Sequence, residues 1–114
     1  VLTALERTFA DDKGRWLLDG SGHAELALSG VLDGEVTSVI LDRVRIDEND
    51  THWIVDYKTS THEGGNLEAF LQAEVDRYSP QLAKYQELYR AYTNADTRCA
   101  LYFPLLQKFV PLSL

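Results

Sequence analysis

The sequence contains no methionine, only one cysteine, and fewer basic than acidic residues. Because Cys99 has no second cysteine to pair with, no internal disulfide forms, and one thiol does not supply a four-cysteine zinc or iron–sulfur site. This usage is typical of a reducing, cytoplasmic setting. No apolar run approaches the roughly 20 residues that span a bilayer, so no membrane partner is expected. Since the chain starts at Val1 and lacks methionine, we expect a piece of a longer polypeptide.

The charge balance limits the class of ligand. The 114 residues carry 11 Lys and Arg against 18 Asp and Glu, a formal net charge of −7. Phosphate contacts need clustered basic side chains, so this balance argues against a domain that binds nucleic acid unaided.

The pattern of apolar residues predicts one α/β domain over residues 1–114 with a mixed sheet. Apolar spacing predicts a helix over residues 1–9, whereas residues 14–22 are typical of a short extended piece and a turn. Helical spacing predicts two helices after a connection at 60–66, separated at Ser79-Pro80 by an N-cap serine and a first-turn proline. Alternating or β-branched runs predict five strands, over residues 23–32, 35–46, 52–58, 97–103 and 107–114.

The run WIVDYKTS, residues 53–60, is an apolar strand that ends in Asp56 and Lys58, whose side chains emerge from the same face. If the preceding hairpin turns near Asn49, then Asp42 on the outgoing strand lies opposite Asp56. Side chains directly opposed across two strands lie about 5 Å apart at Cβ, where like charges are destabilising. The hairpin therefore predicts a closely spaced pair of acids.

Asp42 and Asp56 are predicted to share their face with apolar side chains, those of Ile40, Val44, Ile46 and Ile54. Two neighbouring carboxylates on such a surface need a proton or a cation. A divalent metal with oxygen ligands meets this need, and Lys58 has the reach to hold a water or a phosphate oxygen, as phosphodiester hydrolysis requires. The acid-x-Lys triplet alone is not specific, because Asp11 to Lys13 also fits, and a surface ion pair is the alternative reading.

The segments ILDRV, WIVDYKTS and RYSPQLAKY, in this order, resemble the PD-(D/E)XK nuclease superfamily over residues 25–103. The likeness is strongest to the C-terminal nuclease domain of RecB-like and AddA-like ATP-dependent helicase–exonucleases, which belong to the UvrD/Rep superfamily and process double-strand DNA ends. The resemblance implies a restriction-endonuclease-like core of a helix, three strands, a helix and a strand. It also implies a Mg²⁺- or Mn²⁺-dependent exonuclease in DNA repair and recombination, with DNA delivered by a helicase part of the same chain and with a partner subunit.

The resemblance also assigns roles to individual residues. Asp42 and Asp56 match the metal-binding acids, and the main-chain carbonyl of Tyr57 would be a further metal ligand. Lys58 matches the lysine that is placed at the attacking water.

Further matches lie outside this triplet. Gln81 and Tyr85 match a Gln-x-x-x-Tyr motif beside the active site, and four residues apart on a helix they project from one face. Glu25 matches an acid found at the start of the first core strand in this family. The alternative is that Glu25 is an ordinary acid at a strand end. Members of this branch also use a helical histidine upstream of that strand, but His23 lies in a turn, so we expect the equivalent residue before the start of the chain.

Other polar and aromatic residues are predicted to have structural roles. Arg43 and Arg45 occupy the sheet face opposite Asp42 and are expected to pair with acids or to stack on the rings of strand 52–58. His52 and His62 are expected to face solvent. Core-like helical spacing predicts packing roles for three tyrosines, Tyr78, Tyr89 and Tyr92.

Two functions remain open. The first is a metal-dependent DNA exonuclease or end-processing nuclease, whose acidic charge is tolerable because a helicase motor delivers the strand and cations neutralise the acids. The second is a nuclease-like module without activity, retained for contacts with protein or DNA in a helicase complex. The first is favoured because all four motif residues, Asp42, Asp56, Lys58 and Gln81, are present.

Overall fold

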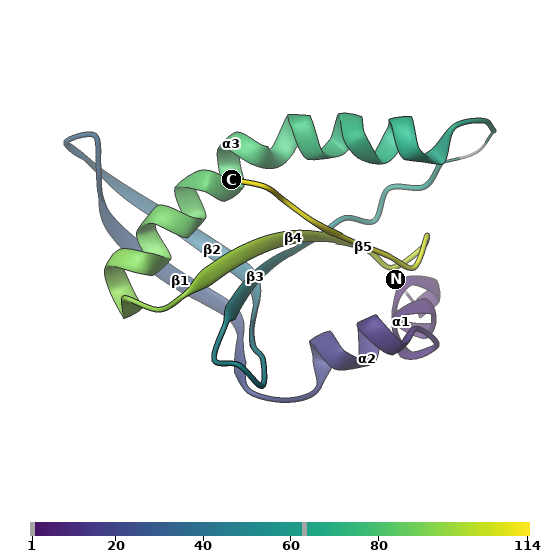
Figure 1. Ribbon diagram of the computed structural model, residues 1–114, viewed down its shortest axis with the longest axis horizontal. Helices are drawn as coiled ribbons and strands as arrows, with labels where there is room; N and C mark the ends of the chain where they lie inside the picture. The colour runs from purple at the N-terminus through teal and green to yellow at the C-terminus, as the bar shows by residue number, and fades with distance from the viewer. Residues whose placement is uncertain (1, 63) are drawn as a thin grey trace.

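A five-stranded mixed sheet with helices on both faces organises the chain (Figure 1). The structure is a computed structural model that describes residues 2–62 and 64–114. Val1 and Glu63, which fall in the predicted first helix and in the predicted connection, lie outside the described residues. In chain order the elements are α1 (Leu2–Phe9), α2 (Asp12–Leu18), β1 (Gly22–Leu32), β2 (Glu35–Ile46), β3 (His52–Tyr57), α3 (Leu67–Thr93), β4 (Thr97–Phe103) and β5 (Lys108–Pro111).

The strands lie side by side in chain order, and only β3 and β4 are parallel. Parallel neighbours need a long crossover, which α3 provides. In Figure 1, α3 covers one face of the sheet, while α1 and α2 lie on the other. This arrangement confirms the predicted α/β fold with a mixed sheet. Within the described part of the chain, no helix is long and apolar enough to cross a membrane.

The hairpin of β2 and β3 has the register that its turn predicts. Arg43 pairs with Val55, and continuing this register places Asp42 opposite Asp56. The ladder of paired residues stops at Arg43 and Val55. The two acids therefore lie directly beyond the last regular pair, where side chains can replace main-chain partners.

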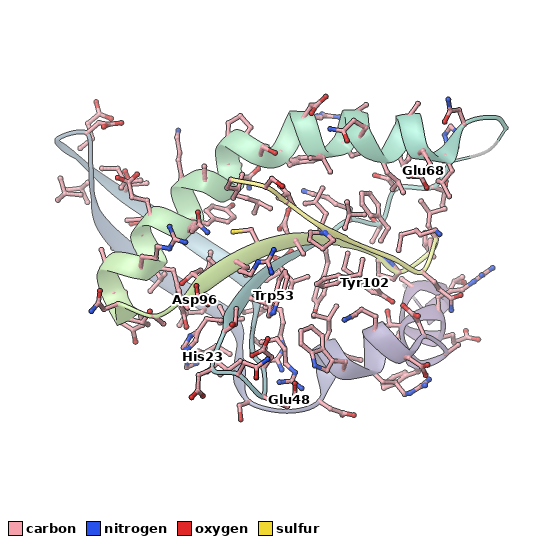
Figure 2. All side chains as sticks on the ribbon, viewed as in Figure 1. His23, Glu48, Trp53, Glu68, Asp96 and Tyr102 are labelled. Carbon is pink, nitrogen blue, oxygen red and sulfur yellow. The ribbon has the colours of Figure 1, made fainter. Side chains whose placement is uncertain are left out.

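Two apolar clusters hold the layers together. The larger lies between α3 and the sheet, and the smaller between α2 and the opposite sheet face. Tyr102 of the smaller cluster, labelled in Figure 2, extends from β4 toward the helices on that side, where its hydroxyl donates to Asp11 Oδ2 at 2.6 Å. The fully buried members of the larger cluster are Leu41, Val44, Ile54, Leu82, Tyr89, Cys99, Leu101 and Phe103.

The extended piece predicted for residues 14–22 is wrong, because residues 12–18 form helix α2. Leu17 is fully buried in the smaller cluster, so packing against the sheet stabilises this short helix. Gly14 permits close helix packing, since a Cβ there would lie 2.3 Å from the carbonyl oxygen of Thr8. The predicted turn follows this helix, where Gly20 and Gly22 have φ values of 79° and 139° that favour glycine.

The predicted division of residues 67–93 into two helices at Ser79-Pro80 is also wrong. Helix α3 runs continuously from Leu67 to Thr93 with Pro80 inside it. Leu71 before the proline and Leu82 after it are both buried in the larger cluster. Burial on both sides offsets the hydrogen bond that a proline removes from a helix interior.

We predict that Leu82→Ala destabilises the domain by about 2–5 kcal/mol, because it leaves a cavity in the fully buried cluster below α3. The matched control is Leu5→Ala, whose side chain is 47% exposed and which should change stability by less than about 1 kcal/mol. Urea unfolding followed by circular dichroism measures both. Equal losses in the two variants would contradict the assigned core.

Candidate active site

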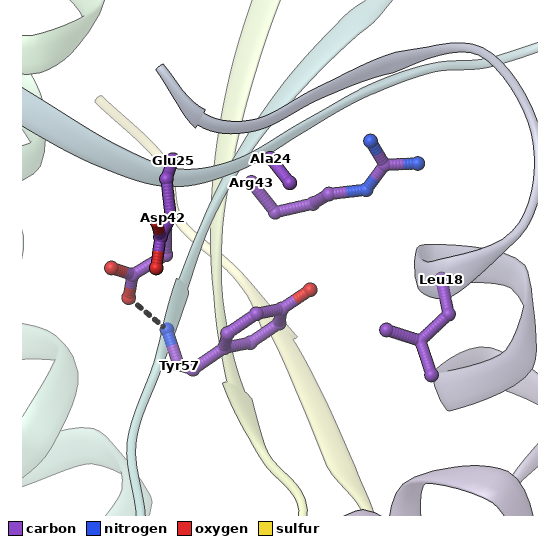
Figure 3. A pocket seen from close by; sticks show the side chains of 6 residues that line it. All are labelled: Leu18, Ala24, Glu25, Asp42, Arg43 and Tyr57. Atoms are coloured by element: carbon purple, nitrogen blue, oxygen red, sulfur yellow. Dashed lines mark hydrogen bonds between the residues drawn. The ribbon is translucent and has the colours of Figure 1, made fainter. Parts of the chain in front are cut away.

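The carboxylate of Asp42 takes the place of a main-chain acceptor between β2 and β3. Its Oδ2 accepts a hydrogen bond of 2.9 Å from the main-chain N–H of Tyr57, directly after the regular ladder ends (Figure 3). On the other side of β3, the N–H of Lys58 donates to the carbonyl of Tyr102 at 2.8 Å. The backbone around Asp56 is thus fixed from both neighbouring strands, so its side chain has a defined direction.

Asp56 and Lys58 form an ion pair of low solvent exposure. Lys58 Nζ lies 2.8 Å from Asp56 Oδ2, and the two side chains are 18% and 11% exposed. Oδ2 of Asp56 is buried, and within residues 2–62 and 64–114 its polar contact is this ion pair. A carboxylate oxygen has two lone pairs, so it retains the capacity to accept a further ligand.

Burial and, to a smaller extent, the adjacent Asp42 carboxyl raise the pKa of Asp56 to about 6, against the opposing effect of the Lys58 ammonium. Two carboxylates that share one space cannot both ionise without compensation. The pair therefore has a physical requirement for a proton or a cation, as the opposed acids in the sequence predict.

Glu25 of β1 occupies the register position opposite Asp42 on the other side of β2, but the two residues do not pair in the ladder. Glu25 has a φ of 52°, a left-handed conformation that costs a non-glycine residue about 1 kcal/mol. Three acids thus lie at successive register positions across three strands. An open pocket of about 520 Å³ is found here (Figure 3), lined by Leu18, Ala24, Glu25, Asp42, Arg43 and Tyr57.

The regular in–out alternation of β2 breaks at this position, so the predicted place of Ile40 on the apolar face is wrong. Ile40 is 64% exposed, and its neighbour Leu41 is fully buried in the α3 cluster instead. Val44 belongs to the same cluster as Leu41, although regular alternation would put residues that share a face two positions apart rather than three. The irregular backbone at Glu25, opposite Asp42, accounts for this change of direction.

Gln81 and Tyr85 contact each other rather than the acid pair. The side-chain amide of Gln81 donates to the hydroxyl of Tyr85 one helical turn away on α3. Gln81 is exposed, and Tyr85 packs against the larger cluster. Among the described residues, neither side chain makes a hydrogen bond or ion pair with Asp42, Asp56 or Lys58. The structure thus brings the two acids and the lysine together, but not the Gln-x-x-x-Tyr pair.

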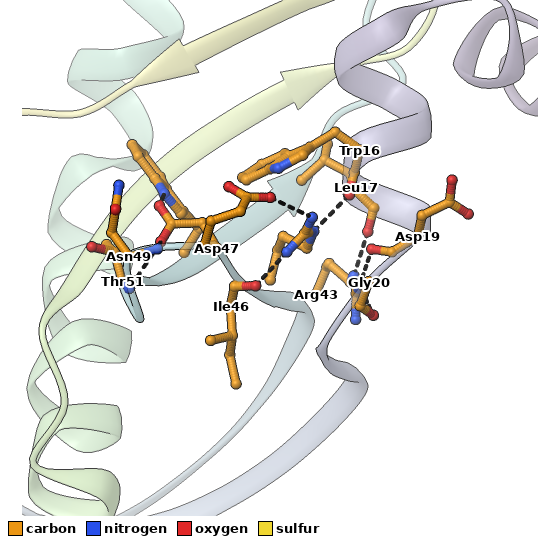
Figure 4. Close-up of polar contacts among 12 residues, drawn as sticks. Trp16, Leu17, Asp19, Gly20, Arg43, Ile46, Asp47, Asn49 and Thr51 are labelled. Atoms are coloured by element: carbon orange, nitrogen blue, oxygen red, sulfur yellow. Dashed lines mark hydrogen bonds and ion pairs between the residues drawn. The ribbon is translucent and has the colours of Figure 1, made fainter.

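Arg43 and Arg45 fasten α2 to the sheet (Figure 4). Arg43 Nε donates to the carbonyl of Leu17 at 2.6 Å, and Arg45 Nε to that of Trp16 at 2.7 Å. The guanidinium of Arg45 lies 4.6 Å from the Trp16 ring centroid and 3.6 Å from the Glu48 carboxylate. Of the two predicted alternatives, pairing with an acid therefore occurs for Arg45, and the ring that its guanidinium contacts belongs to α2 rather than to β3.

The two histidines expected to face solvent are both half-buried, which corrects that prediction. His52 Nδ1 lies 2.5 Å from the hydroxyl of the buried Tyr89. The ring of His62 stacks on Phe70 with centroids 4.8 Å apart. Their aromatic neighbours on α3 hold both rings against the domain. His23, labelled in Figure 2, is exposed.

The donor set at the acid pair fits a hard divalent cation. In residues 2–62 and 64–114, no three His, Cys, Asp or Glu side chains gather closely enough to hold a metal by themselves. Mg²⁺, however, usually binds through one or two carboxylates and keeps several waters. The carboxylates of Asp56 and Asp42 supply such a pair.

We predict that Asp56→Asn makes the domain more stable at pH 8 in metal-free buffer. The folded-state pKa of Asp56, about 6, lies above its ordinary value of 3.8, so the folded state holds the proton more tightly than the unfolded chain. This contribution to stability is complete below about pH 4 and is lost as the pH rises through 6. The variant avoids the loss, which two pKa units put at about 3 kcal/mol.

Urea unfolding of both proteins between pH 4 and 8, with a chelator present, measures this difference. Asp33→Asn, on the exposed turn between β1 and β2, is the matched control. A stability difference for Asp56→Asn that does not change with pH would show that the burial of this acid is misassigned.

Comparison with known protein families agrees with this geometry. The sequence profile described as the PD-(D/E)XK nuclease superfamily matches residues 3–110, which include both acids, the lysine and all five strands except the last residue of β5. No curated protein matches the chain significantly. On the strength of a match over nearly its whole length, and with the expected fold, the chain belongs to the PD-(D/E)XK nuclease superfamily.

Proposed function

We propose that this chain is the catalytic domain of a metal-dependent nuclease that hydrolyses phosphodiester bonds in DNA. The observation that supports this most directly is the acid pair, in which the buried Asp56 carboxylate lies beside that of Asp42 and 2.8 Å from the Lys58 ammonium. One ammonium does not compensate two adjacent carboxylates, so the pair favours a bound proton or a divalent cation.

In this proposal Asp42 and Asp56, with the main-chain carbonyl of Tyr57, hold Mg²⁺ or Mn²⁺. The bound cation would stabilise negative charge on the phosphate. Lys58 orients the attacking water and donates to charge that develops in the transition state, and its low exposure strengthens this interaction. The Asp42 carboxylate also fixes the main-chain direction of Tyr57, which places Lys58 relative to both acids.

Supporting roles are proposed for the remaining predicted residues. Glu25 lines the same pocket as Asp42, so it would face a bound phosphate or its metal ion. Gln81 and Tyr85, joined by their hydrogen bond on α3, would contact the DNA strand as it passes the acid pair. In chain order, β1 with Glu25 precedes the hairpin that carries the acids, and α3 with Gln81 and Tyr85 follows it.

The resemblance to RecB-like and AddA-like enzymes supports a more specific proposal. The domain would act as an exonuclease or end-processing nuclease of an ATP-dependent helicase–nuclease in the cytoplasm, during double-strand break repair and recombination. The net charge of −7 fits a domain that receives DNA from a helicase part of the same chain, or from a partner subunit, rather than one that binds DNA alone.

A second candidate is a nuclease-like module without activity that contacts protein or DNA within a helicase complex. The specific observation in its favour is that Gln81 and Tyr85 contact each other and not the acids. Activity of the natural full-length polypeptide separates the two candidates.

We predict that the natural full-length polypeptide degrades DNA with Mg²⁺ or Mn²⁺ and not with a chelator. Lys58→Ala should lower kcat on the order of 10²-fold or more, because a preorganised positive group acts chiefly in the transition state. Release of labelled nucleotides from linear DNA measures the rate, and circular dichroism checks folding. The matched control is Lys108→Ala, an exposed lysine on β5, which should retain activity. A folded, metal-supplied protein that cuts no DNA, or a fully active Lys58→Ala variant, would favour the inactive module.

A further inference from the structure

Lys58 has a second contact that the acid pair does not explain. It follows the last residue of β3, so no strand neighbour fixes its long side chain. Its Nζ lies 3.6 Å from the ring centroid of Tyr78, which belongs to α3. The same Nζ lies 2.8 Å from Asp56 Oδ2. The ammonium is therefore held between a carboxylate on one element and an aromatic face on another.

We propose that Tyr78 is a positioning residue, whose ring face holds the Lys58 ammonium at the acid pair in the orientation that catalysis needs. This inference rests on the proposed nuclease function. A lysine side chain has about 2 kcal/mol of rotamer entropy, so its tip needs an anchor to stay in one place. A cation over an aromatic face gains about 0.5–1 kcal/mol when exposed and about 2 when desolvated.

An aromatic anchor suits this position better than a second carboxylate would. The ring attracts the ammonium through its negative face and carries no formal charge. It neither neutralises Lys58 nor adds a third negative group beside Asp42 and Asp56. An ammonium has three N–H donors, so Nζ retains donors for a water or a phosphate oxygen beside its contact with Asp56.

Helix α3 holds the ring in place. Tyr78 is half-buried and packs against the cluster between α3 and the sheet. Arg77 also approaches this ring, with its guanidinium carbon 5.3 Å from the centroid, a longer distance than that of Lys58 Nζ. The sequence predicts Tyr78 only as a packing residue, although its place three residues before Gln81 puts both on one helix face.

The experiment compares Tyr78→Leu and Tyr78→Phe in the natural full-length polypeptide at saturating Mg²⁺. Tyr78→Leu should lower kcat for DNA cleavage about thirtyfold, the equivalent of one desolvated cation–π contact. KM and the Mg²⁺ concentration for half-maximal activity should not change. Tyr78→Phe keeps the ring and should remain within about twofold of the wild type. Tyr92→Leu, at a tyrosine that is 62% exposed on the same helix, is the matched control and should be silent.

A second comparison tests whether Tyr78 acts through Lys58. In the Lys58→Ala background, Tyr78→Leu should cause no further loss of kcat. An equal loss in both backgrounds, a changed KM, or a loss in Tyr78→Phe as large as in Tyr78→Leu would overturn the proposal, because each indicates a role other than placing the ammonium.

A measurement without catalysis separates this inference from the proposed function. NMR of the same protein should show the Lys58 methylene protons next to Nζ shifted upfield by the ring of Tyr78, in the wild type and in Tyr78→Phe but not in Tyr78→Leu. This result supports the contact even if no DNA is cut, in which case the nuclease function alone fails. Ordinary proton shifts in the wild type would overturn the inference whatever the activity.

Discussion

The close opposition of Asp42 and Asp56 on neighbouring strands is the constraint on which the arrangement of the site depends. Opposed carboxylates repel each other, and burial together with the neighbouring Asp42 raises the pKa of Asp56 to about 6. The surrounding groups compensate only in part. The Tyr57 main-chain N–H contacts Asp42, and the Lys58 ammonium contacts Asp56. The fold therefore holds negative charge that a bound proton or cation would neutralise.

The rest of the fold places this pair at an opening in the sheet. The β2–β3 ladder ends one position before the acids, and Glu25 on β1 leaves the regular strand conformation opposite Asp42. The parallel pairing of β3 with β4 requires a crossover, and α3 supplies it on the same side as Lys58, where Tyr78 contacts the ammonium. On the other face of the sheet, Arg43 and Arg45 attach α2 to β2 through hydrogen bonds. Helix α2 in turn contributes Leu18 to the lining of the open pocket.

Local sequence patterns predict the hairpin and its acid pair well, because a short turn fixes the register and the register fixes which side chains are opposed. The mixed sheet follows from the order of apolar runs. Features that depend on distant contacts are less predictable. Helix α2 is not predicted from the local pattern, because Gly14 resembles a turn signal. In the structure this glycine instead permits close packing against Thr8. The continuity of α3 through Pro80 depends on burial over both halves of the helix.

Within the site, the same distinction holds. Alternation alone places Ile40 beside the acids, and it fails because Glu25, on another strand, has a left-handed backbone that no pattern in β2 reveals. The roles given to Gln81 and Tyr85 come from the family resemblance and remain proposals, since their side chains contact each other. Tyr78 has no distinguishing local pattern, because its contact with Lys58 exists only after α3 crosses the sheet.

The requirement of the acid pair for a proton or a cation is tested most directly by carbon NMR of its carboxyl groups during a pH titration. In metal-free solution the account predicts that Asp56 titrates near pH 6, well above an ordinary aspartate at 3.8. Added Mg²⁺ should move this midpoint to lower pH, since the cation binds the ionised form. Carboxyl groups on the far side of the domain should not respond. An ordinary midpoint for Asp56 without metal, or a midpoint that Mg²⁺ leaves unchanged, would contradict the account.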